Sequence, residues 1–253
     1  MSSTTDGNHG TAVTPTASLT GRTAIVTGAS RGIGLAIARA FVDAGAHVAL
    51  VARSEHALRD VARHLGPRAS VIACDVTDAD AIASAVDRMQ REFRGAPEIV
   101  VNNAGAFELA PIERTDPAMF ATTLDTNLVA PFLFVRAFLP AMRVRGSGHI
   151  VTIGSIADRA VFPENAAYAA SKHGVRALHE VLRLELRGTG VRASLVSPGP
   201  VDTDLWDDID PDNRPGFTPR ADMLRATAVA EAVRFAVTRP ADVNVDELRL
   251  SRS

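Results

Sequence analysis

The sequence predicts an α/β protein with a single doubly wound domain and a seven-stranded, mostly parallel sheet. From Leu19 onward, short β-branched runs alternate with longer amphipathic segments, which is the pattern of repeated strand–helix–strand units. No stretch rich in Pro and Gly interrupts this alternation, so we expect residues 19–253 to form one domain. A length of 253 residues, with 46% hydrophobic and 22% charged residues, suits a globular domain of this class.

Each predicted strand is a short apolar run, and a helical stretch follows every strand but the last. The expected strands are Thr23–Thr27, His47–Ala52, Ser70–Cys74, Ile99–Asn102, Ile150–Ile153, Arg192–Val196 and Glu247–Leu250. Ligands of open α/β sheets bind outside the carboxyl ends of the strands. We therefore expect the loops that follow these strands to meet in one crevice.

Composition limits the partners and the compartment. A net charge of −2 argues against a nucleic-acid-binding surface, and no apolar run approaches the ~20 residues that cross a bilayer, so we expect no membrane partner. A single cysteine, Cys74, is compatible with a reducing compartment and a cytoplasmic protein. Residues 1–18 are rich in Ser and Thr and lack the features of a signal peptide, so we expect a disordered tail.

A glycine-rich loop follows the first strand and leads into a predicted helix at Leu35–Ala44. Its glycines allow a sharp turn and a close approach to a ligand, while the helix N-terminus offers N–H groups to a pyrophosphate. The spacing is Gly-x-x-x-Gly-x-Gly, which departs from the general dinucleotide fingerprint Gly-x-Gly-x-x-Gly. We predict cofactor contacts in this loop at Gly28, Ser30, Arg31, Gly32, Ile33 and Gly34.

The end of the second strand decides which dinucleotide is expected. An acidic residue there would bind a ribose 2′-hydroxyl, but this chain has Arg53 instead, and Arg31 lies in the glycine loop. Two guanidinium groups favour a 2′-phosphate, so the sequence favours NADP(H) over NAD(H). The alternative is that both arginines only solvate the surface, and the nearby Glu55 keeps it open.

The later strand ends supply further cofactor contacts at the same edge of the sheet. Asp75 ends the third strand and can accept a hydrogen bond from an adenine amino group, and small residues form the turns after the fourth and sixth strands. The expected contacts outside the glycine loop are Arg53, Asp75, Val76, Asn103, Ala104, Gly105, Pro198, Gly199, Val201 and Thr203.

Tyr168, the only tyrosine in the chain, precedes Lys172 by four residues in a predicted helix, so both side chains can face one cleft. A neighbouring ammonium favours the phenolate, so we expect Lys172 to lower the pKa of Tyr168 and allow proton exchange near neutral pH. Taken alone, this short and common motif indicates an ordinary pair on a helix surface, and it is the other site residues that favour a catalytic pair.

Two further polar residues are candidates for the same site. Ser155 ends the fifth strand, and the loop after it is long enough to bring its hydroxyl beside Tyr168. Pro131 has no N–H for the carbonyl of Asn127, so we expect a kink that leaves this oxygen free to hold water. Alternatively, Ser155 is structural and Asn127 faces solvent.

In this order and at these strand ends, the residues resemble the short-chain dehydrogenase/reductase family from Leu19 to the C-terminus. Thr27–Gly34 is similar to its cofactor loop, Asn102–Gly105 to its Asn-Asn-Ala-Gly turn, and Pro198–Thr203 to its Pro-Gly segment. The residues that match the family's catalytic tetrad are Asn127, Ser155, Tyr168 and Lys172. The resemblance implies a Rossmann-type domain in an NADP-preferring enzyme without a metal, commonly a homotetramer or homodimer.

The resemblance also implies a mechanism, in which hydride moves between nicotinamide and a carbonyl carbon. Tyr168 would act as general acid/base, Ser155 would orient the oxygen, and Lys172 would bind the nicotinamide ribose as well as tune Tyr168. Both Tyr168 and Lys172 would therefore also contact the cofactor. The alternatives are an NAD-linked alcohol or hydroxy-acid dehydrogenase and an NADP-binding sensor or scaffold without turnover.

Three departures from the family pattern stand out. Gly154 stands where a second serine is frequent, and Asp158 replaces a common glycine and is expected to alter the pocket rim. The chain also lacks the long glycine-rich C-terminal strand of many relatives, a hint of small hydroxy acids or polar alcohols as substrates.

Substrate specificity is expected in the loops Ala106–Arg114, Ile156–Asn165 and Asp202–Arg220. Apolar side chains suggest a partly apolar pocket, namely Phe107, Leu109, Phe162 and Trp206. Asp202–Arg220 has little apolar periodicity, so we predict a mobile substrate lid there; a fixed surface loop or a subunit contact is the alternative.

Overall fold

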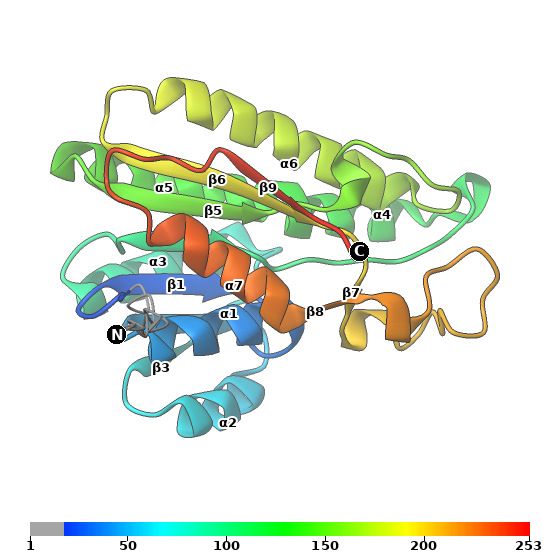
Figure 1. Ribbon diagram of the computed structural model, residues 1–253, viewed down its shortest axis with the longest axis horizontal. Helices are drawn as coiled ribbons and strands as arrows, with labels where there is room; N and C mark the ends of the chain where they lie inside the picture. The colour runs from blue at the N-terminus through cyan, green and yellow to red at the C-terminus, as the bar shows by residue number, and fades with distance from the viewer. Residues whose placement is uncertain (1–17) are drawn as a thin grey trace, which may run out of the picture.

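The computed structural model describes residues 18–253 as an α/β fold with one seven-stranded sheet (Figure 1). Apart from Ser18, the predicted disordered tail lies outside the described residues. The strands, in chain order, are β1 (Thr23–Thr27), β2 (His47–Ala52), β3 (Ala69–Ala73), β4 (Ile99–Asn102), β5 (Gly148–Ile153), β6 (Val191–Pro198) and β9 (Glu247–Leu250). They lie in the order β3-β2-β1-β4-β5-β6-β9, and every neighbouring pair is parallel. The predicted fold class and all seven strands are confirmed.

Helices cover both faces of the sheet. The helices are α1 (Gly32–Asp43), α2 (Glu55–Leu65), α3 (Ala79–Phe93), α4 (Pro117–Leu124), α5 (Ala130–Arg145), α6 (Ala166–Glu185) and α7 (Ala226–Val237). Side chains of α1, α2 and α7 pack in one core cluster, and side chains of α3, α5 and α6 pack in the other. The strand β1 shows why the sheet needs both: Ile25 and Val26 are fully buried in opposite clusters because successive side chains of a strand point to opposite faces.

The stretch from Pro117 to Arg145 corrects one expectation. It combines α4, a π-helical turn at Asp125–Val129 and α5, and by length and composition alone it could cross a membrane. From the sequence, no apolar run of this length was predicted. In this fold its side chains Phe134 and Phe138 are buried against the sheet, and a core helix has the same composition.

The π-helical turn lies directly before Pro131, where a kink was expected. The N–H of Ala130 donates to the carbonyl of Asp125, five residues back, instead of to the residue four back. The helix therefore adapts to the proline by widening one turn, and the backbone runs on as α5.

A second, very short sheet was not predicted. Its strands are β7 (Val201–Asp202) and β8 (Leu224–Arg225), which pair in parallel. Their pairing brings together the two ends of the segment that follows β6. Asp202–Arg220 therefore projects as a loop at the right of Figure 1. Strands of two residues leave no periodic signal in a sequence.

Candidate active site

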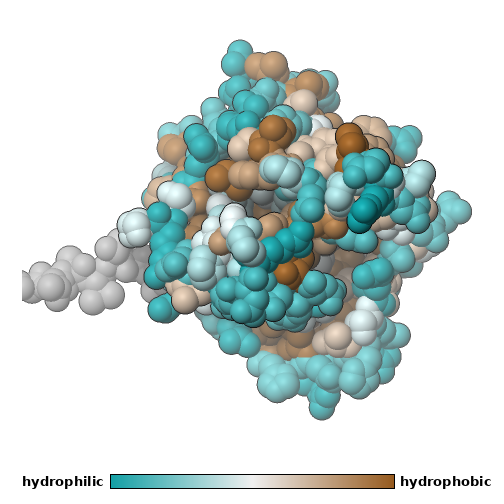
Figure 2. Space-filling model, turned by 90° about the vertical axis from the view of Figure 1, so that its right-hand side faces the viewer, coloured by the Kyte–Doolittle hydropathy of each residue, from teal (hydrophilic) through white to brown (hydrophobic). Residues whose placement is uncertain are grey.

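The carboxyl ends of the parallel strands open into one large cavity of about 1580 Å³. Loops that follow β1 to β6 all contribute to its lining, as the parallel sheet predicted. Figure 2 shows this side of the molecule: hydrophobic side chains gather in the hollowed centre, and hydrophilic ones surround them. A cofactor and a substrate can therefore meet within one site.

Nearly all predicted cofactor contacts line this cavity. They are Gly28, Ser30, Arg31, Gly32, Ile33, Arg53, Asp75, Val76, Asn103, Ala104, Gly105, Tyr168, Lys172, Pro198, Gly199, Val201 and Thr203. Gly34 is the exception, because it lies beneath the loop. A Cβ on Gly34 would stand only 2.2 Å from the carbonyl oxygen of Gly28.

The glycine loop has the shape of an anion cradle. Gly28 and Gly32 have φ of +67° and +55°, which side chains rarely tolerate. Arg31 is the N-cap of α1, and its side chain does not cap the helix, so the first-turn N–H groups are left for another acceptor. This arrangement fits the pyrophosphate of a dinucleotide.

A residue absent from the predicted contacts holds this cradle in place. The hydroxyl of Thr27 accepts hydrogen bonds from the N–H groups of Asn103 and Ala104, both at 2.9 Å. The Asn103 side chain in turn donates to the Thr27 carbonyl at 2.8 Å. The Asn103 amide therefore ties the β1 and β4 loops together. The sequence could have pointed to Thr27, because it is a polar residue at the end of a buried strand, directly before the glycine loop.

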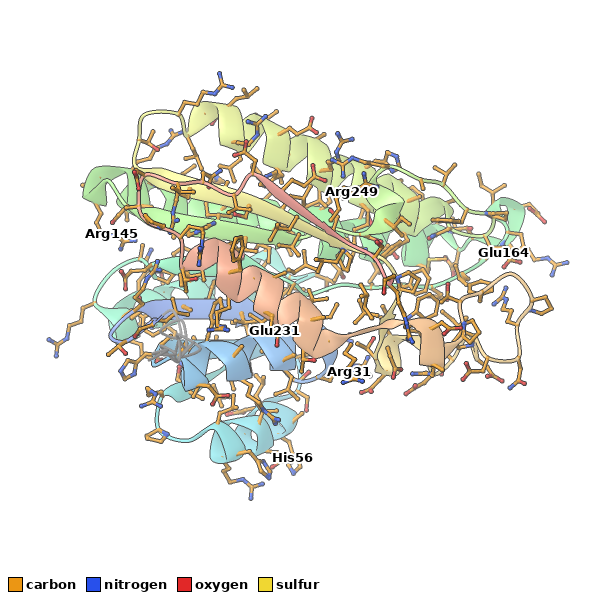
Figure 3. The ribbon with its side chains drawn as sticks, viewed as in Figure 1. Arg31, His56, Arg145, Glu164, Glu231 and Arg249 are labelled. Atoms are coloured by element: carbon orange, nitrogen blue, oxygen red, sulfur yellow. The ribbon has the colours of Figure 1, made fainter. Side chains whose placement is uncertain are left out.

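The part of the cavity beside the ends of β2 and β3 carries the predicted charges. Arg53 is exposed at the end of β2, and Arg31 is also exposed, with Nη1 4.0 Å from Oδ2 of Asp204 (Figure 3). Oδ1 of Asp75 accepts from the backbone N–H and the hydroxyl of Thr77, and these bonds hold the pKa of Asp75 below its usual range. Both guanidinium groups have the solvent access that a 2′-phosphate would need.

Three of the four predicted catalytic residues line the cavity, namely Ser155, Tyr168 and Lys172. The ammonium of Lys172 donates to the carbonyl of Ile153 at 3.0 Å and lies 5.5 Å from the ring centroid of Tyr168. Ser155 follows Gly154 at the end of β5, and its hydroxyl accepts from the N–H of Ala157 at 3.1 Å. Helix α6 and the end of strand β5 thus bring these three groups together.

Asn127 lies behind the cavity wall. Its side chain exchanges two hydrogen bonds with the backbone of Ala106, at 2.8 and 2.9 Å, and donates to the Ser171 hydroxyl at 2.9 Å. The buried amide therefore joins the β4 loop to α6. This excludes the alternative that Asn127 faces solvent.

The expected direction of the Tyr168 pKa is wrong for the protein alone. Burial raises the pKa of Tyr168 above its usual value, and the neighbouring Ser155 hydroxyl only partly opposes this. Burial also lowers the pKa of Lys172 to about 8. Desolvation is the largest cause of both shifts, and the nearby carboxylate of Asp158 raises the pKa of Tyr168 further.

Aromatic side chains line the part of the cavity beside Tyr168. The ring of Phe107 meets the ring of Tyr168 edge-on at 4.7 Å between centroids, and Trp206 lies 5.2 Å from Phe107. Phe217, which was not predicted, extends this row at 6.3 Å from Trp206. Leu109 and Phe162 also line the cavity, as expected for a partly apolar pocket. Asp158 is absent from the lining and is buried, so it does not shape the pocket rim.

Two ion pairs lie within the Asp202–Arg220 segment, which lacks apolar periodicity, and a third joins the segment to another loop. The guanidinium of Arg220 binds Asp202 at 2.9 Å and Asp207 at 2.5 Å. Arg214 pairs with Glu164, which belongs to the loop on the opposite side of the cavity. Figure 3 shows Glu164 at the outer edge of this face. Breaking the Arg214–Glu164 contact would be needed for the segment to swing away.

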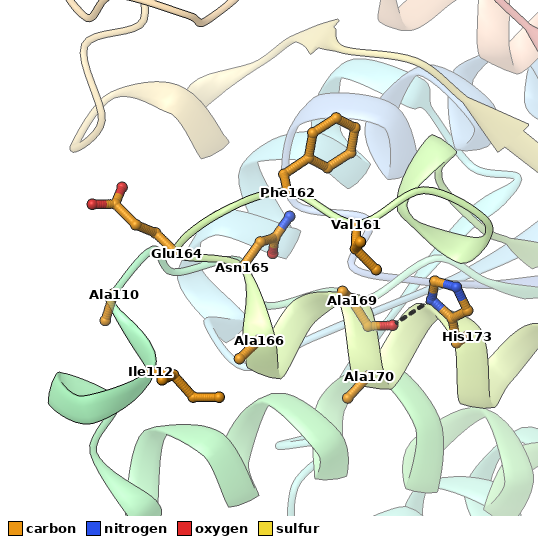
Figure 4. A pocket seen from close by; sticks show the side chains of 10 residues that line it. All are labelled: Ala110, Ile112, Val161, Phe162, Glu164, Asn165, Ala166, Ala169, Ala170 and His173. Atoms are coloured by element: carbon orange, nitrogen blue, oxygen red, sulfur yellow. Dashed lines mark hydrogen bonds between the residues drawn. The ribbon is translucent and has the colours of Figure 1, made fainter.

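A second pocket of about 440 Å³ adjoins the cavity mouth (Figure 4). Small and apolar side chains dominate its wall, and His173 at its far end hydrogen-bonds the Ala169 carbonyl at 3.0 Å. Phe162, Glu164 and Asn165 line both pockets, so one loop separates them. Within residues 18–253, no group of three or more His, Cys, Asp or Glu side chains is placed to hold a metal ion.

Comparisons with known proteins agree with this geometry. The sequence model of the short chain dehydrogenase family matches residues 22–214. The chain is 35% identical to an uncharacterized oxidoreductase of Staphylococcus epidermidis, over 90% of this chain and 96% of that protein.

Solved structures show the same likeness. A metagenomic short-chain oxidoreductase in complex with NADP is 34% identical, with a TM-score of 0.80 over 93% of this chain and 98% of that one. The closed form of a serine dehydrogenase complexed with NADP+ is 32% identical, with a TM-score of 0.83 over 90% of this chain and 94% of that one.

Proposed function

Because the chain belongs to the short chain dehydrogenase family and is an oxidoreductase that acts on CH–OH donors with a nicotinamide cofactor, we propose that it interconverts a carbonyl and a secondary alcohol with NADP(H). The observation that carries this proposal is the meeting of Ser155, Tyr168 and Lys172 in one cavity with the glycine cradle. A protein that only sensed NADP would have no need of a phenol and a buried ammonium side by side in this cavity.

The residues divide the reaction between them. When bound, the nicotinamide supplies or accepts the hydride. Tyr168 donates its phenolic proton to the carbonyl oxygen as negative charge develops there, and the Ser155 hydroxyl orients that oxygen. Lys172, held by the Ile153 carbonyl, keeps a positive charge close to the phenol. Asn127 fixes the loop and the helix that frame the site.

The proposed function is tested by a panel of ketones and aldehydes assayed by loss of NADPH absorbance. Apolar and aryl carbonyls are expected to be reduced fastest, because the aromatic row of Phe107, Trp206 and Phe217 extends directly from Tyr168. Small hydroxy acids belong in the same panel, since one neighbouring structure is a serine dehydrogenase. Failure to turn over any member in either direction would contradict the proposed function.

The preference for NADP(H) rests on Arg31 and Arg53, and the NADP found in both neighbouring structures supports it. We predict that Arg53→Asp shifts the ratio of kcat/KM for NADPH over NADH by roughly tenfold or more towards NADH. A lost charge-assisted contact and a new repulsion act in the same direction. Steady-state kinetics with both cofactors measures the ratio.

Arg59→Asp is the matched control for this charge reversal. Arg59 is exposed on α2, two residues before which Arg53 is also exposed, but Arg59 lies outside the cavity. Its substitution should leave the ratio unchanged. An unchanged ratio in Arg53→Asp would leave Arg31 alone to carry the preference.

We further propose that Asp202–Arg220 closes over the substrate. Trp206, the only tryptophan, lies in this segment, and its indole N–H donates to the Val201 carbonyl at 3.0 Å. Cofactor with a substrate analogue should shift the emission maximum of Trp206 to the blue and slow its quenching by iodide. Cofactor alone is the control. A saturated ternary complex with unchanged emission and quenching would rule out the lid.

Two expectations about the whole protein are also proposals: a homodimer or homotetramer and a cytoplasmic location. Exposed apolar side chains on α5 and α6 support self-association, among them Phe132, Val181 and Leu184. Sedimentation analysis measures the assembly state directly.

A further inference from the structure

Asp158 is a buried carboxylate that the proposed mechanism does not use. Its side chain is 1% exposed. Asp158 is the last residue of the short helix Ile156–Asp158, which Ser155 precedes. Oδ2 accepts a hydrogen bond from the Ser197 hydroxyl at 2.5 Å, and Oδ1 lies 3.3 Å from Nη1 of Arg159. A charged side chain buried this deeply is rare unless it is paired or functional.

The carboxylate lies behind the strand end that holds the catalytic groups. Oδ2 of Asp158 would be only 2.8 Å from a Cβ at Gly154. On either side of Gly154, the Ile153 carbonyl binds the ammonium of Lys172, and the Ser155 hydroxyl neighbours the phenol of Tyr168. One residue of backbone therefore separates Asp158 from the two contact points of the catalytic pair. Any larger residue at position 154 would push Asp158 away.

The surrounding charges leave this carboxylate only partly neutralised. Arg159 is engaged mainly by Glu247 of β9, which binds it through both oxygens at 2.5 and 2.7 Å. Glu180 of α6 also acts on Arg159. Ser197 of β6 is neutral, so the cations that face Asp158 are Arg159 and Lys172. The negative charge is thus felt by Lys172 and Tyr168 across a medium of low dielectric constant.

We propose that Asp158 is a positioning residue of the active site, whose buried carboxylate keeps the proton on the phenol of Tyr168 and on the ammonium of Lys172, and so adapts the site to donate a proton to a carbonyl. The proposal rests on the proposed function. In reduction, the proton leaves the Tyr168 oxygen for the carbonyl oxygen while hydride from the reduced nicotinamide reaches the carbonyl carbon. The negative charge of Asp158 opposes early loss of this proton, because it raises the pKa of both Tyr168 and Lys172.

The test uses the fact that Tyr168 is the only tyrosine in the chain. The absorbance change on phenol ionisation therefore reports this residue alone and requires no turnover. Asp158→Asn keeps the shape and removes the charge, so the midpoint for Tyr168 should fall by roughly half a pH unit or more. The high-pH limit of NADPH-dependent reduction should fall with it, with little change in KM.

Two control variants separate charge from structure. Ser197→Ala removes the hydrogen bond but keeps the carboxylate, so the Tyr168 midpoint should stay close to the wild-type value. Asp246→Asn removes an exposed carboxylate just before β9, and it should leave the midpoint unchanged. If Asp158→Asn does not fold, the double variant Asp158→Ala/Ser197→Ala replaces the whole buried pair with apolar atoms and should lower the midpoint in the same way.

The outcomes separate this inference from the proposed function. An unmoved Tyr168 midpoint in a folded Asp158 variant overturns the role of Asp158, even if the wild type reduces carbonyls. A lowered midpoint in a protein that reduces nothing supports the electrostatic link and overturns the proposed function instead. A midpoint that falls equally in Ser197→Ala would assign the effect to loop structure and would also overturn the charge argument.

Discussion

Tyr168→Phe is expected to abolish turnover while the affinity for NADP stays within a few fold. The phenyl ring keeps its edge contact with Phe107, at 4.7 Å between centroids, so packing is preserved and only the proton donor is lost. Cofactor binding measured by calorimetry and reduction followed by NADPH absorbance separate the two effects. More than about a tenth of wild-type kcat, a barrier change under ~1.4 kcal/mol, would be incompatible with the role of Tyr168.

Phe107→Leu is the matched control for the aromatic contact. It removes the ring that packs on Tyr168 but leaves the phenol in place, and Phe107 lies on the substrate side of the cavity. We expect a higher KM for apolar carbonyls and a far smaller loss of kcat than in Tyr168→Phe. Comparable losses of kcat in both variants would point to packing as the cause.

The second large effect is expected for Gly34→Ala. The new Cβ would stand 2.2 Å from the Gly28 carbonyl oxygen and 2.5 Å from Nδ2 of Asn103, so the glycine loop must move. Overpacking of this kind lowers the free energy of unfolding by about 1–3 kcal/mol. The affinity for NADP should fall by roughly tenfold or more, because the loop is the predicted pyrophosphate site. Denaturant unfolding and calorimetry measure the two quantities.

Gly105→Ala controls for the stability effect in the same cavity. A Cβ at Gly105 meets nothing closer than 3.6 Å. Its φ also lies outside the left-handed region, so the unfolding free energy should change little. Equal destabilisation by the two substitutions would show that the close approach of Gly34 to Gly28 is not the cause.

Several features were predictable because short stretches of sequence encode them. The strand Thr23–Thr27 has three consecutive apolar residues at its centre because the sheet buries both faces, and that composition is visible without a partner strand. Parallel strands end at one edge, so Ser155 and Arg53 could be assigned to one crevice before any contact was known. Glycine at 28, 32 and 34 marked the sharp turn for the same local reason.

The tertiary structure alone decided how those residues are charged and held. The pKa of Tyr168 rises because the assembled fold removes water from its phenol, and the spacing of Tyr168 and Lys172 carries no information on burial. Asp158 owes its position to Ser197, which is remote in the chain, and Asn127 owes its position to Ala106 and Ser171. Local patterns in the sequence determine the strands and their ends, whereas desolvation and hydrogen-bond pairing depend on which distant segments the folded chain brings together.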